Sequence, residues 1–242
     1  LTLTGLMTLT AGTLATDHAG SPLSHSWGSF ASTGGTLTPG ASTITVTSNG
    51  TFWDVANSLT ITANTSTIVS TAANGSFLGG TTQTYYNLTF NPGNNASGPL
   101  GTFLSCNNLT LTGTAAKLPN FRFGQDCSIT GTFTATGQSV TNRIHVRSIT
   151  IGTAVTVTAA FVTLTNADFI DITGAGAAAP WTGTSMGDAL GNSGITFNAS
   201  VAQAATGTAS FTWSTHGWTT RVPLPQDDVT IANAFVAGRT VT

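Results

Sequence analysis

The sequence predicts an all-β protein: a single-stranded right-handed parallel β-helix, or β-solenoid, of roughly ten coils with about 20–25 residues per coil. Two observations lead to this prediction. Short threonine-rich segments recur along the chain at a nearly constant step, and the residues that usually form surface helices are scarce. The 242-residue chain has no glutamate and a single lysine, Lys117. Threonine makes up roughly a fifth of it, a composition that favours strands over helices.

Internal repeats set the expected length of the coil. Residues 41–44 and 49–52 return as residues 65–68 and 74–77, a step of about 24 or 25 residues. A second motif recurs at steps of about 20 or 21 residues, at residues 87–90, 108–111, 128–132 and 148–153. Stacked coils should align one aliphatic side chain each in a core ladder, which we predict to be Leu3, Leu23, Ile44, Ile68, Leu88, Leu109, Ile129, Ile149, Ile170 and Ile195.

Each coil is expected to consist of about three short strands joined by turns. Apolar residues alternate with threonine in residues 43–47, 109–112 and 155–158, which places one face of each strand in the core and a row of hydroxyls outside. Glycine, asparagine and proline between the alternating segments mark the corners. At about 4.8 Å per coil, the stack would form a rod roughly 50 Å long.

The second unusual feature is the low content of charged residues, 6% of the chain, with a net charge of −2. Equivalent positions of stacked coils lie one strand spacing apart, so a repeated charge would form a column of like charges. Columns of Thr, Ser and Asn can instead hydrogen-bond along the axis. The same composition argues against nucleic acid as a partner. In the basic stretch 143–147, we interpret Arg143, His145 and Arg147 as the outward face of one strand.

Two regions are predicted along the chain: β-solenoid coils over residues 1–205, and a cap or the start of a following module over residues 206–242. Proline cannot donate to a strand ladder and tryptophan can cover exposed apolar ends, so the predicted cap or interface residues are Trp213, Trp218, Pro223 and Pro225. Both ends of the chain lie in alternating segments. We therefore expect uncapped ends that pair with neighbouring copies or continue a longer polypeptide. No stretch is long and apolar enough to predict a membrane span.

The C-terminal stretch also resembles known sequences. Trp-x4-Trp at 213–218, Pro-x-Pro-x-Asp-Asp-Val-x-Ile at 223–231 and Gly-x-Thr-Val-Thr at 238–242 resemble the opening of β-helix modules in large repetitive surface and phage-encoded proteins. Residues 8–14 with 27–30, and residues 168–172 through 191–197, are similar to coils of the same group. The resemblance implies a phage tail-fibre-like or cell-surface filament protein. Fold analogy alone does not assign a function.

The candidates for catalytic carboxylates are Asp168, Asp171 and Asp188, in a Gly- and Ala-rich stretch. Glycan hydrolases of the β-helix type place carboxylates about 5 to 10 Å apart across one groove. Asp168 and Asp171 are an odd number of residues apart and would face opposite sides of a strand unless a bulge intervenes. We therefore interpret Asp168 and Asp171 as residues that cap turns, and we predict no catalytic residue.

No metal-binding or cofactor-binding residue is predicted either. The four histidines have no ligand spacing, and no glycine-rich phosphate loop opens a helix. A calcium site in the loop around Asp188 stays open as an alternative, because oxygen ligands have no strict spacing.

Cys106 and Cys127 are one coil apart, so stacking would bring them near each other. Two states stay open: a disulfide between adjacent coils, which requires suitable Cα separation and Cβ directions, or two buried thiols. A disulfide would indicate an oxidising, extracellular environment.

Three functions are compatible with these patterns. The preferred hypothesis is a structural, non-enzymatic module of an extracellular filament or a phage or virion fibre, with copies of itself as partners. An alternative is an adhesin or receptor-binding tail fibre that holds cell-surface glycans by stacking sugar rings on Tyr85, Tyr86, Trp53 or Trp181. The third is a polysaccharide depolymerase that uses the three aspartates above.

Overall fold

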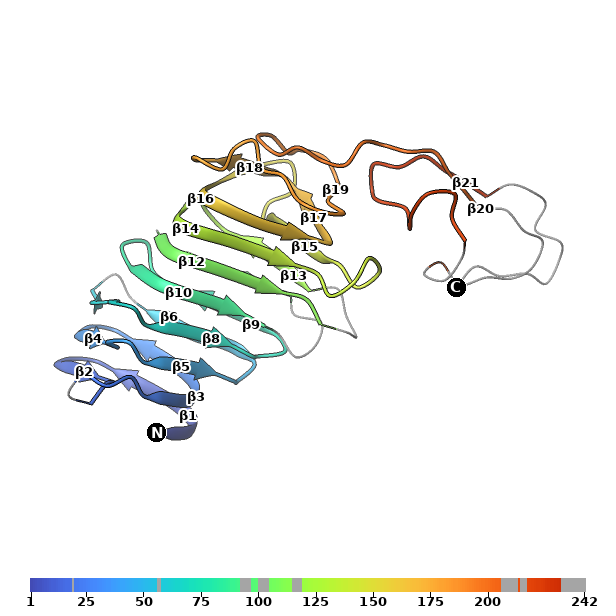
Figure 1. The fold of residues 1–242 in the computed structure, drawn as a ribbon. Helices are drawn as coiled ribbons and strands as arrows, with labels where there is room; N and C mark the ends of the chain where they lie inside the picture. Colours follow the sequence, from blue (N-terminus) through green and yellow to red (C-terminus); the bar gives the residue numbers. More distant parts are fainter. Residues whose placement is uncertain are drawn as a thin grey trace.

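The computed structural model describes residues 1–18, 20–55, 58–91, 97–99, 105–114, 119–205, 213 and 217–231. These residues form strands and no helix, and the pairings between strands are parallel. The strands stack as a β-solenoid of about nine turns (Figure 1). The predicted fold class is therefore confirmed, with about nine turns in place of roughly ten.

Four sheets organise the described strands. The long sheet contains β1 (Thr2–Leu9), β3 (Ser24–Ser32), β5 (Thr43–Val46), β6 (Gly50–Val55), β8 (Thr67–Ser70), β9 (Gly75–Leu78), β10 (Thr84–Phe90), β12 (Ser105–Thr112), β14 (Cys127–Thr136), β16 (Val155–Thr165) and β18 (Ile172–Ala175). The short sheet contains β11 (Ser97–Pro99), β13 (Asn120–Phe123), β15 (Ile144–Ser148), β17 (Ala167–Ile170) and β19 (Gly187–Asp188). The remaining sheets are β2 (Thr13–Ala15) with β4 (Thr36–Thr38) and β7 (Thr60–Ile61), and β20 (Gln203–Ala205) with β21 (Val229–Ile231).

Alternation of apolar residues and threonine explains why these segments form strands. In β5, Ile44 and Val46 are buried while Thr43 and Thr45 stay partly exposed on the other face. β12 follows the same pattern, with Leu109 and Leu111 buried. Strands of this kind contribute one row to the core and one row of hydroxyls or amides to the outside, as the alternation predicts.

Aromatic rings fill the core of the early coils. Trp27, Phe30, Trp53 and Phe77 have no exposed surface, and their successive ring centroids lie 5.7, 4.5 and 6.0 Å apart. Trp53 Nε1 donates a hydrogen bond to the Tyr85 hydroxyl at 3.0 Å, and that hydroxyl donates to the Gly79 carbonyl at 2.7 Å. The polar atoms of both rings are therefore satisfied inside the core.

The predicted core ladder is only partly correct. Ile44, Ile68, Leu88 and Leu109 stack in register on adjacent strands and are buried. Ile129 is buried too, but in another column, opposite Cys106. Leu3, Ile170 and Ile195 are half-buried.

Leu23 and Ile149 are the incorrect members of that ladder, with exposed fractions of 42% and 44%. Leu23 lies in the corner before β3, and the residue of this coil that stands opposite Ile44 is His25. Ile149 follows the last residue of β15 and lies in a bend, so its side chain is not on the inner row of a strand.

The register changes because the coils differ in length. Leu109 stands opposite Phe133, and Phe133 opposite Val162, with irregularities in the β12–β14 and β14–β16 pairings. Hydrogen-bonded residues on adjacent coils are 20 and 21 residues apart at Thr67–Asn87 and Asn87–Asn108, which bond through their side chains, but 24 apart where the Thr132 backbone N–H donates to Asn108. Connections of different length absorb most of the extra residues, and each bulge shifts the register by one, so a constant step fails beyond β12.

The chain leaves the stack after the last coil (Figure 1). β20 pairs with β21, and neither pairs with a coil. Residues 203–205, which we predicted to belong to the coils, are thus part of the C-terminal segment. Residues 206–212, 214–216 and 232–242 of the predicted cap lie outside the described residues.

Candidate functional site

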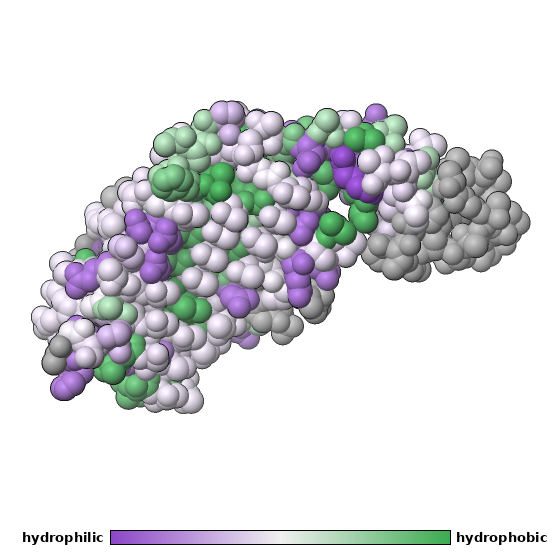
Figure 2. All heavy atoms as spheres, viewed as in Figure 1, coloured by the Kyte–Doolittle hydropathy of each residue, from purple (hydrophilic) through white to green (hydrophobic). Residues whose placement is uncertain are grey.

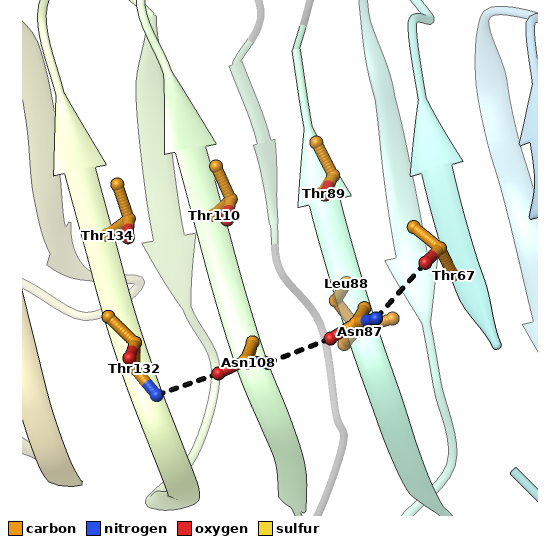
Figure 3. Close-up of a pocket in the computed structure, with 8 residues that line it drawn as sticks. All are labelled: Thr67, Asn87, Leu88, Thr89, Asn108, Thr110, Thr132 and Thr134. Carbon is orange, nitrogen blue, oxygen red and sulfur yellow. Dashed lines mark hydrogen bonds between the residues drawn. The ribbon is translucent and has the colours of Figure 1, made fainter. Parts of the chain in front are cut away.

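A ladder of asparagine and threonine side chains crosses the outer face of the long sheet (Figure 3). Asn87 Nδ2 donates to Thr67 Oγ1 at 3.1 Å, and Asn108 Nδ2 donates to Asn87 Oδ1 at 2.9 Å. The backbone N–H of Thr132 then donates to Asn108 Oδ1 at 2.9 Å. The ladder connects β8, β10, β12 and β14, because an amide can donate to one neighbour and accept from the next. Neutral columns that hydrogen-bond along the axis were predicted, and these contacts confirm them.

A bulge in β14 ends this ladder. The Asn108 side chain bends over Gly131, where an added Cβ would lie 2.6 Å from Asn108 Oδ1 and 2.7 Å from the Asn107 carbonyl oxygen. Asn107 Oδ1 accepts a second bond there, from Thr130 Oγ1 at 3.2 Å. Only glycine leaves room for both asparagines at this position.

The ladder lines a shallow groove with a volume of about 440 Å³. Its walls are Thr67, Asn87, Leu88, Thr89, Asn108, Thr110, Thr132 and Thr134, the residues drawn in Figure 3. Figure 2 shows that much of the visible face is pale, which marks residues of intermediate hydropathy. An open groove lined by amides and hydroxyls suits a hydroxyl-rich, uncharged ligand better than an ion or an apolar one.

The outer side of the short sheet carries charges instead. The side chains of Arg143 and Asp168 are each 8% exposed, and Arg143 Nη2 lies 2.6 Å from Asp168 Oδ1. Arg143 Nε donates to both Asp168 oxygens at 3.0 Å. The rest of the guanidinium donates to Ser185 Oγ and O and to the Ala167 carbonyl. This pair is fully hydrogen-bonded, which a buried ion pair requires to be tolerated.

These contacts correct two predictions. Arg143 was predicted to face outward with His145 and Arg147, but it is buried against Asp168 because that carboxylate needs a counter-charge. His145 and Arg147 do alternate with the buried Ile144 and Val146. Asp168 was predicted to cap a turn, and it holds an ion pair instead. His145 Nε2 stands 3.7 Å from Asp168 Oδ2.

The other two candidate aspartates organise turns. Asp171 has a left-handed backbone (φ 53°) and accepts a bond from the Gly152 N–H at 2.7 Å, which holds a turn of the preceding coil and confirms the predicted role. Asp188 Oδ1 accepts from the Leu190 N–H and from Asn192 Nδ2. Each of the three carboxylates is thus occupied by its own set of donors.

Three of the four aromatic residues proposed to stack on sugars are buried. Trp53 and Trp181 have no exposed surface, and Tyr85 is 2% exposed. They belong to the core because they lie on the inner rows of their coils, so sugar stacking on them is excluded. Tyr86, on the outer row of β10, is half-buried.

Cys106 and Cys127 are two free, buried thiols. They lie in different columns, since Cys106 stands opposite Ile129 and Cys127 opposite Val157. Burial raises the pKa of the Cys106 thiol to about 12 and raises that of Cys127 further, where the nearby Cys106 and Asp126 add to the effect. Both groups are neutral thiols near neutral pH.

The C-terminal segment closes the edge of β19. The Asp188 N–H donates to Gln226 Oε1 at 2.9 Å, and Gln226 Nε2 donates to the Met186 and Asn198 carbonyls at 3.1 and 3.0 Å. The amide thus bonds the N–H and C=O groups that a further strand would take. Sequence analysis missed Gln226 entirely.

The predicted cap residues are only partly involved. Pro225 contacts the last coil, since a Cβ added at Gly187 would lie 2.6 Å from Pro225 Cδ, and Pro223 is half-buried. Trp213 and Trp218 pack on each other with ring centroids 4.6 Å apart. A capping role for the two tryptophans stays a prediction.

Among the described residues, no group of three or more His, Cys, Asp or Glu side chains could hold a metal ion. The same part of the chain contains no helix that could cross a membrane. Comparisons with protein-family models, curated proteins and solved structures gave no match.

Proposed function

We propose that this chain is a structural, non-enzymatic β-solenoid module of an extracellular filament or of a phage or virion fibre, which associates with copies of itself through its β1 end. The observation that carries the proposal is the difference between the two ends of the stack.

The β1 end supports association because its core is incompletely covered. Leu3 and Met7 stand in register with Trp27 and Phe30. Trp27 and Phe30 are fully buried, whereas Leu3 and Met7 stay half-buried. Leu1 and Leu6 are 63% and 60% exposed beside them. Among the described strands β1 pairs with β3 alone, and an apolar strand edge of this kind favours pairing with another strand.

The opposite end supports association less well, because Gln226 already bonds the edge of β19. Above β18, residues 191–198 contribute isolated bridges at Ser193 and Ile195 and no further strand. The proposal therefore places self-association at one end, where the sequence alone led us to expect it at both.

The test compares self-association of the unchanged chain with that of two matched variants. Sedimentation velocity over a range of concentrations should show assemblies larger than 24.5 kDa for the unchanged chain. Leu6→Lys should shift the population to monomer. The control Leu190→Lys, at a residue 76% exposed near the other end, should leave assembly unchanged. A chain that stays monomeric at every concentration, or equal effects of both variants, would contradict the proposal.

A second function, glycan binding, is favoured by the groove over the Asn87–Asn108 ladder. Each ladder amide keeps hydrogen-bonding capacity beyond its contact with the next coil, so the groove offers donors and acceptors to a neutral sugar. A glycan array should then show binding that Asn108→Ala abolishes and that Thr45→Ala, at an outward position on β5 beyond the groove, preserves. Equal binding by all three proteins, or none by the unchanged chain, would exclude this function.

A further inference from the structure

One large aromatic side chain stands on the outside of the long sheet. Phe161 in β16 is 68% exposed, whereas Ala159 and Leu164 of the same strand are buried. Strict alternation from Ala159 would place Phe161 in the core. The β14–β16 register shifts just before this residue, between Ile129 and Thr132, and beyond the shift Phe161 lies on the outer face. The fold thus leaves in solvent a ring whose burial would be favourable.

The register places Phe161 in line with the asparagine ladder. Thr132, where the ladder ends, stands directly opposite Phe161. The row that crosses the strands therefore consists of Thr67, Asn87, Asn108, Thr132 and Phe161. A row of threonines runs beside it, formed by Thr89, Thr110 and Thr134 (Figure 3) and continued by Thr163. With about 4.8 Å between neighbouring strands, the first row is roughly 19 Å long.

These rows combine the two kinds of contact that a sugar can make. The amides of Asn87 and Asn108 each carry two N–H groups, and the ladder uses one of each. The residues that line the groove carry no charge. A pyranose ring with equatorial hydroxyls has a polar rim and two apolar C–H faces. An amide ladder that leads to an exposed phenyl ring therefore matches both the rim and the face of such a sugar.

The shape of the rows selects among neutral glycans. The rows are straight and run along the axis of the stack, from β8 to β16. An extended chain can follow them from ring to ring, whereas a coiled chain leaves them after a short contact. A charged glycan would lose hydration in this groove without meeting an opposite charge.

We propose that the asparagine ladder and Phe161 together bind a linear, extended and neutral glycan that lies along the axis of the stack. One pyranose ring stacks on Phe161, and hydroxyls of the following rings bond to the amides of Asn108 and Asn87. This inference rests on the glycan-binding function proposed for the groove, to which it adds an aromatic contact and a class of ligand.

The primary experiment is isothermal titration calorimetry of the full chain with cellohexaose, a neutral and extended oligosaccharide of glucose. The unchanged chain should bind it saturably. Phe161→Ala should weaken binding about tenfold, because one stacking contact is lost. Phe161→Trp keeps a flat ring and should bind at least as tightly as the unchanged chain. The matched control Ile151→Ala, at a residue 63% exposed in the turn between β15 and β16, should leave binding unchanged.

A second arm tests the extended shape of the ligand. Maltohexaose, the coiled isomer of the same oligosaccharide, should bind about tenfold more weakly. Absence of cellohexaose binding, equal affinity for the two sugars, or equal affinity of Phe161→Ala and the unchanged chain would overturn the proposal. Glycan-array binding that Asn108→Ala abolishes would in that case still support the groove as a glycan site, whereas a chain that binds no glycan on the array would contradict both. Circular dichroism melting curves verify that the variants remain folded.

Discussion

The outer faces of the long and short sheets solve the same stacking problem in different ways. On the long sheet, Asn87 and Asn108 hydrogen-bond from coil to coil and carry no charge. On the short sheet, Arg143 and Asp168 lie one coil apart and pair as opposite charges. An amide is both donor and acceptor, so the same residue type can repeat along the axis. A repeated charge repels its copy on the next coil, so a charge is more favourably placed beside an opposite charge.

The comparison also explains why charge is scarce in this chain. A column of side chains has one neighbour above and one below, each about 4.8 Å away. A neutral amide or hydroxyl can hydrogen-bond to both neighbours. A charge that is paired with one neighbour has no second opposite charge to meet on the other side. The chain therefore concentrates its charges where bulges and corners supply special partners, as Ser185 and Ala167 do for Arg143.

Removal of the Asp168 carboxylate should have the largest effect on stability. Asp168→Ala leaves Arg143 as a buried charge without a counter-charge, and we expect a loss of about 3–5 kcal/mol in the free energy of unfolding. Urea denaturation followed by circular dichroism measures it. The double variant Asp168→Leu, Arg143→Met should be distinctly more stable than Asp168→Ala. If Asp168→Ala unfolds no more easily than the unchanged chain, the ion pair has no structural role.

On the long sheet, the bulge at Gly131 is the most sensitive point. Gly131→Ala places a Cβ against Asn108 Oδ1 and the Asn107 carbonyl, and should cost about 1–3 kcal/mol of stability. Gly5→Ala is the matched control in β1, because an added Cβ there meets nothing within 4 Å. Equal urea midpoints for the two variants would show that the asparagines do not fill the bulge as described.

Loss of one asparagine from the hydrogen-bonded ladder should reduce the stability less. Asn108→Ala removes the bonds to Asn87 and to the Thr132 N–H and should cost about 1–2 kcal/mol, well below the effect of Asp168→Ala. Thr110→Ala, on the outer row of the same strand, should change the unfolding midpoint little. A loss for Asn108→Ala as large as that for Asp168→Ala would remove the distinction between the two faces.

The buried thiols of Cys106 and Cys127 should have the smallest effect on stability near neutral pH. Burial raises the pKa of Cys106 from 9.0 to about 12, so its stabilising contribution is complete below pH 9 and decreases as the pH rises toward 12. Urea unfolding at stepwise higher pH should show a fall in stability above pH 9 that is shallower for Cys106→Ala. A thiol reagent should modify the cysteines only in the unfolded chain. Rapid modification of the native protein would contradict the burial of both thiols.

Much of the fold could be predicted from the sequence because repetition and alternation report directly on parallel stacking. The stacking of Leu88 on Leu109 follows from the motif that both residues share. Phe133 could not be predicted as the next member, because the bulge at Gly131 depends on how the Asn107 and Asn108 side chains fold over the neighbouring strand. Period-two alternation predicts which face of the strand a residue lies on. It does not predict which residue of the next coil stands opposite it.

The site residues were harder to predict for the same reason. Arg143 and Asp168 are 25 residues apart, a separation that has meaning only once the length of that coil is known. Gln226 bonds to the edge of β19, 38 residues away in the sequence, and no repeat predicts this partner. The asparagines of the ladder were visible in the repeated motif, and the signal that could have identified them is their recurrence on an outward row.

The central claim is that unequal coil lengths together with bulges, and not a constant repeat, set the register of the coils. The direct test is disulfide cross-linking in a Cys106→Ala, Cys127→Ala background. The structure places Thr110 opposite Thr134, so the Thr110→Cys, Thr134→Cys variant should form an intramolecular disulfide under mild oxidation, seen by mass spectrometry of digested protein. A constant step of about 20 residues would instead place Thr110 opposite Thr130. Efficient cross-linking of Thr110→Cys, Thr130→Cys, with none at Thr134, would contradict the account.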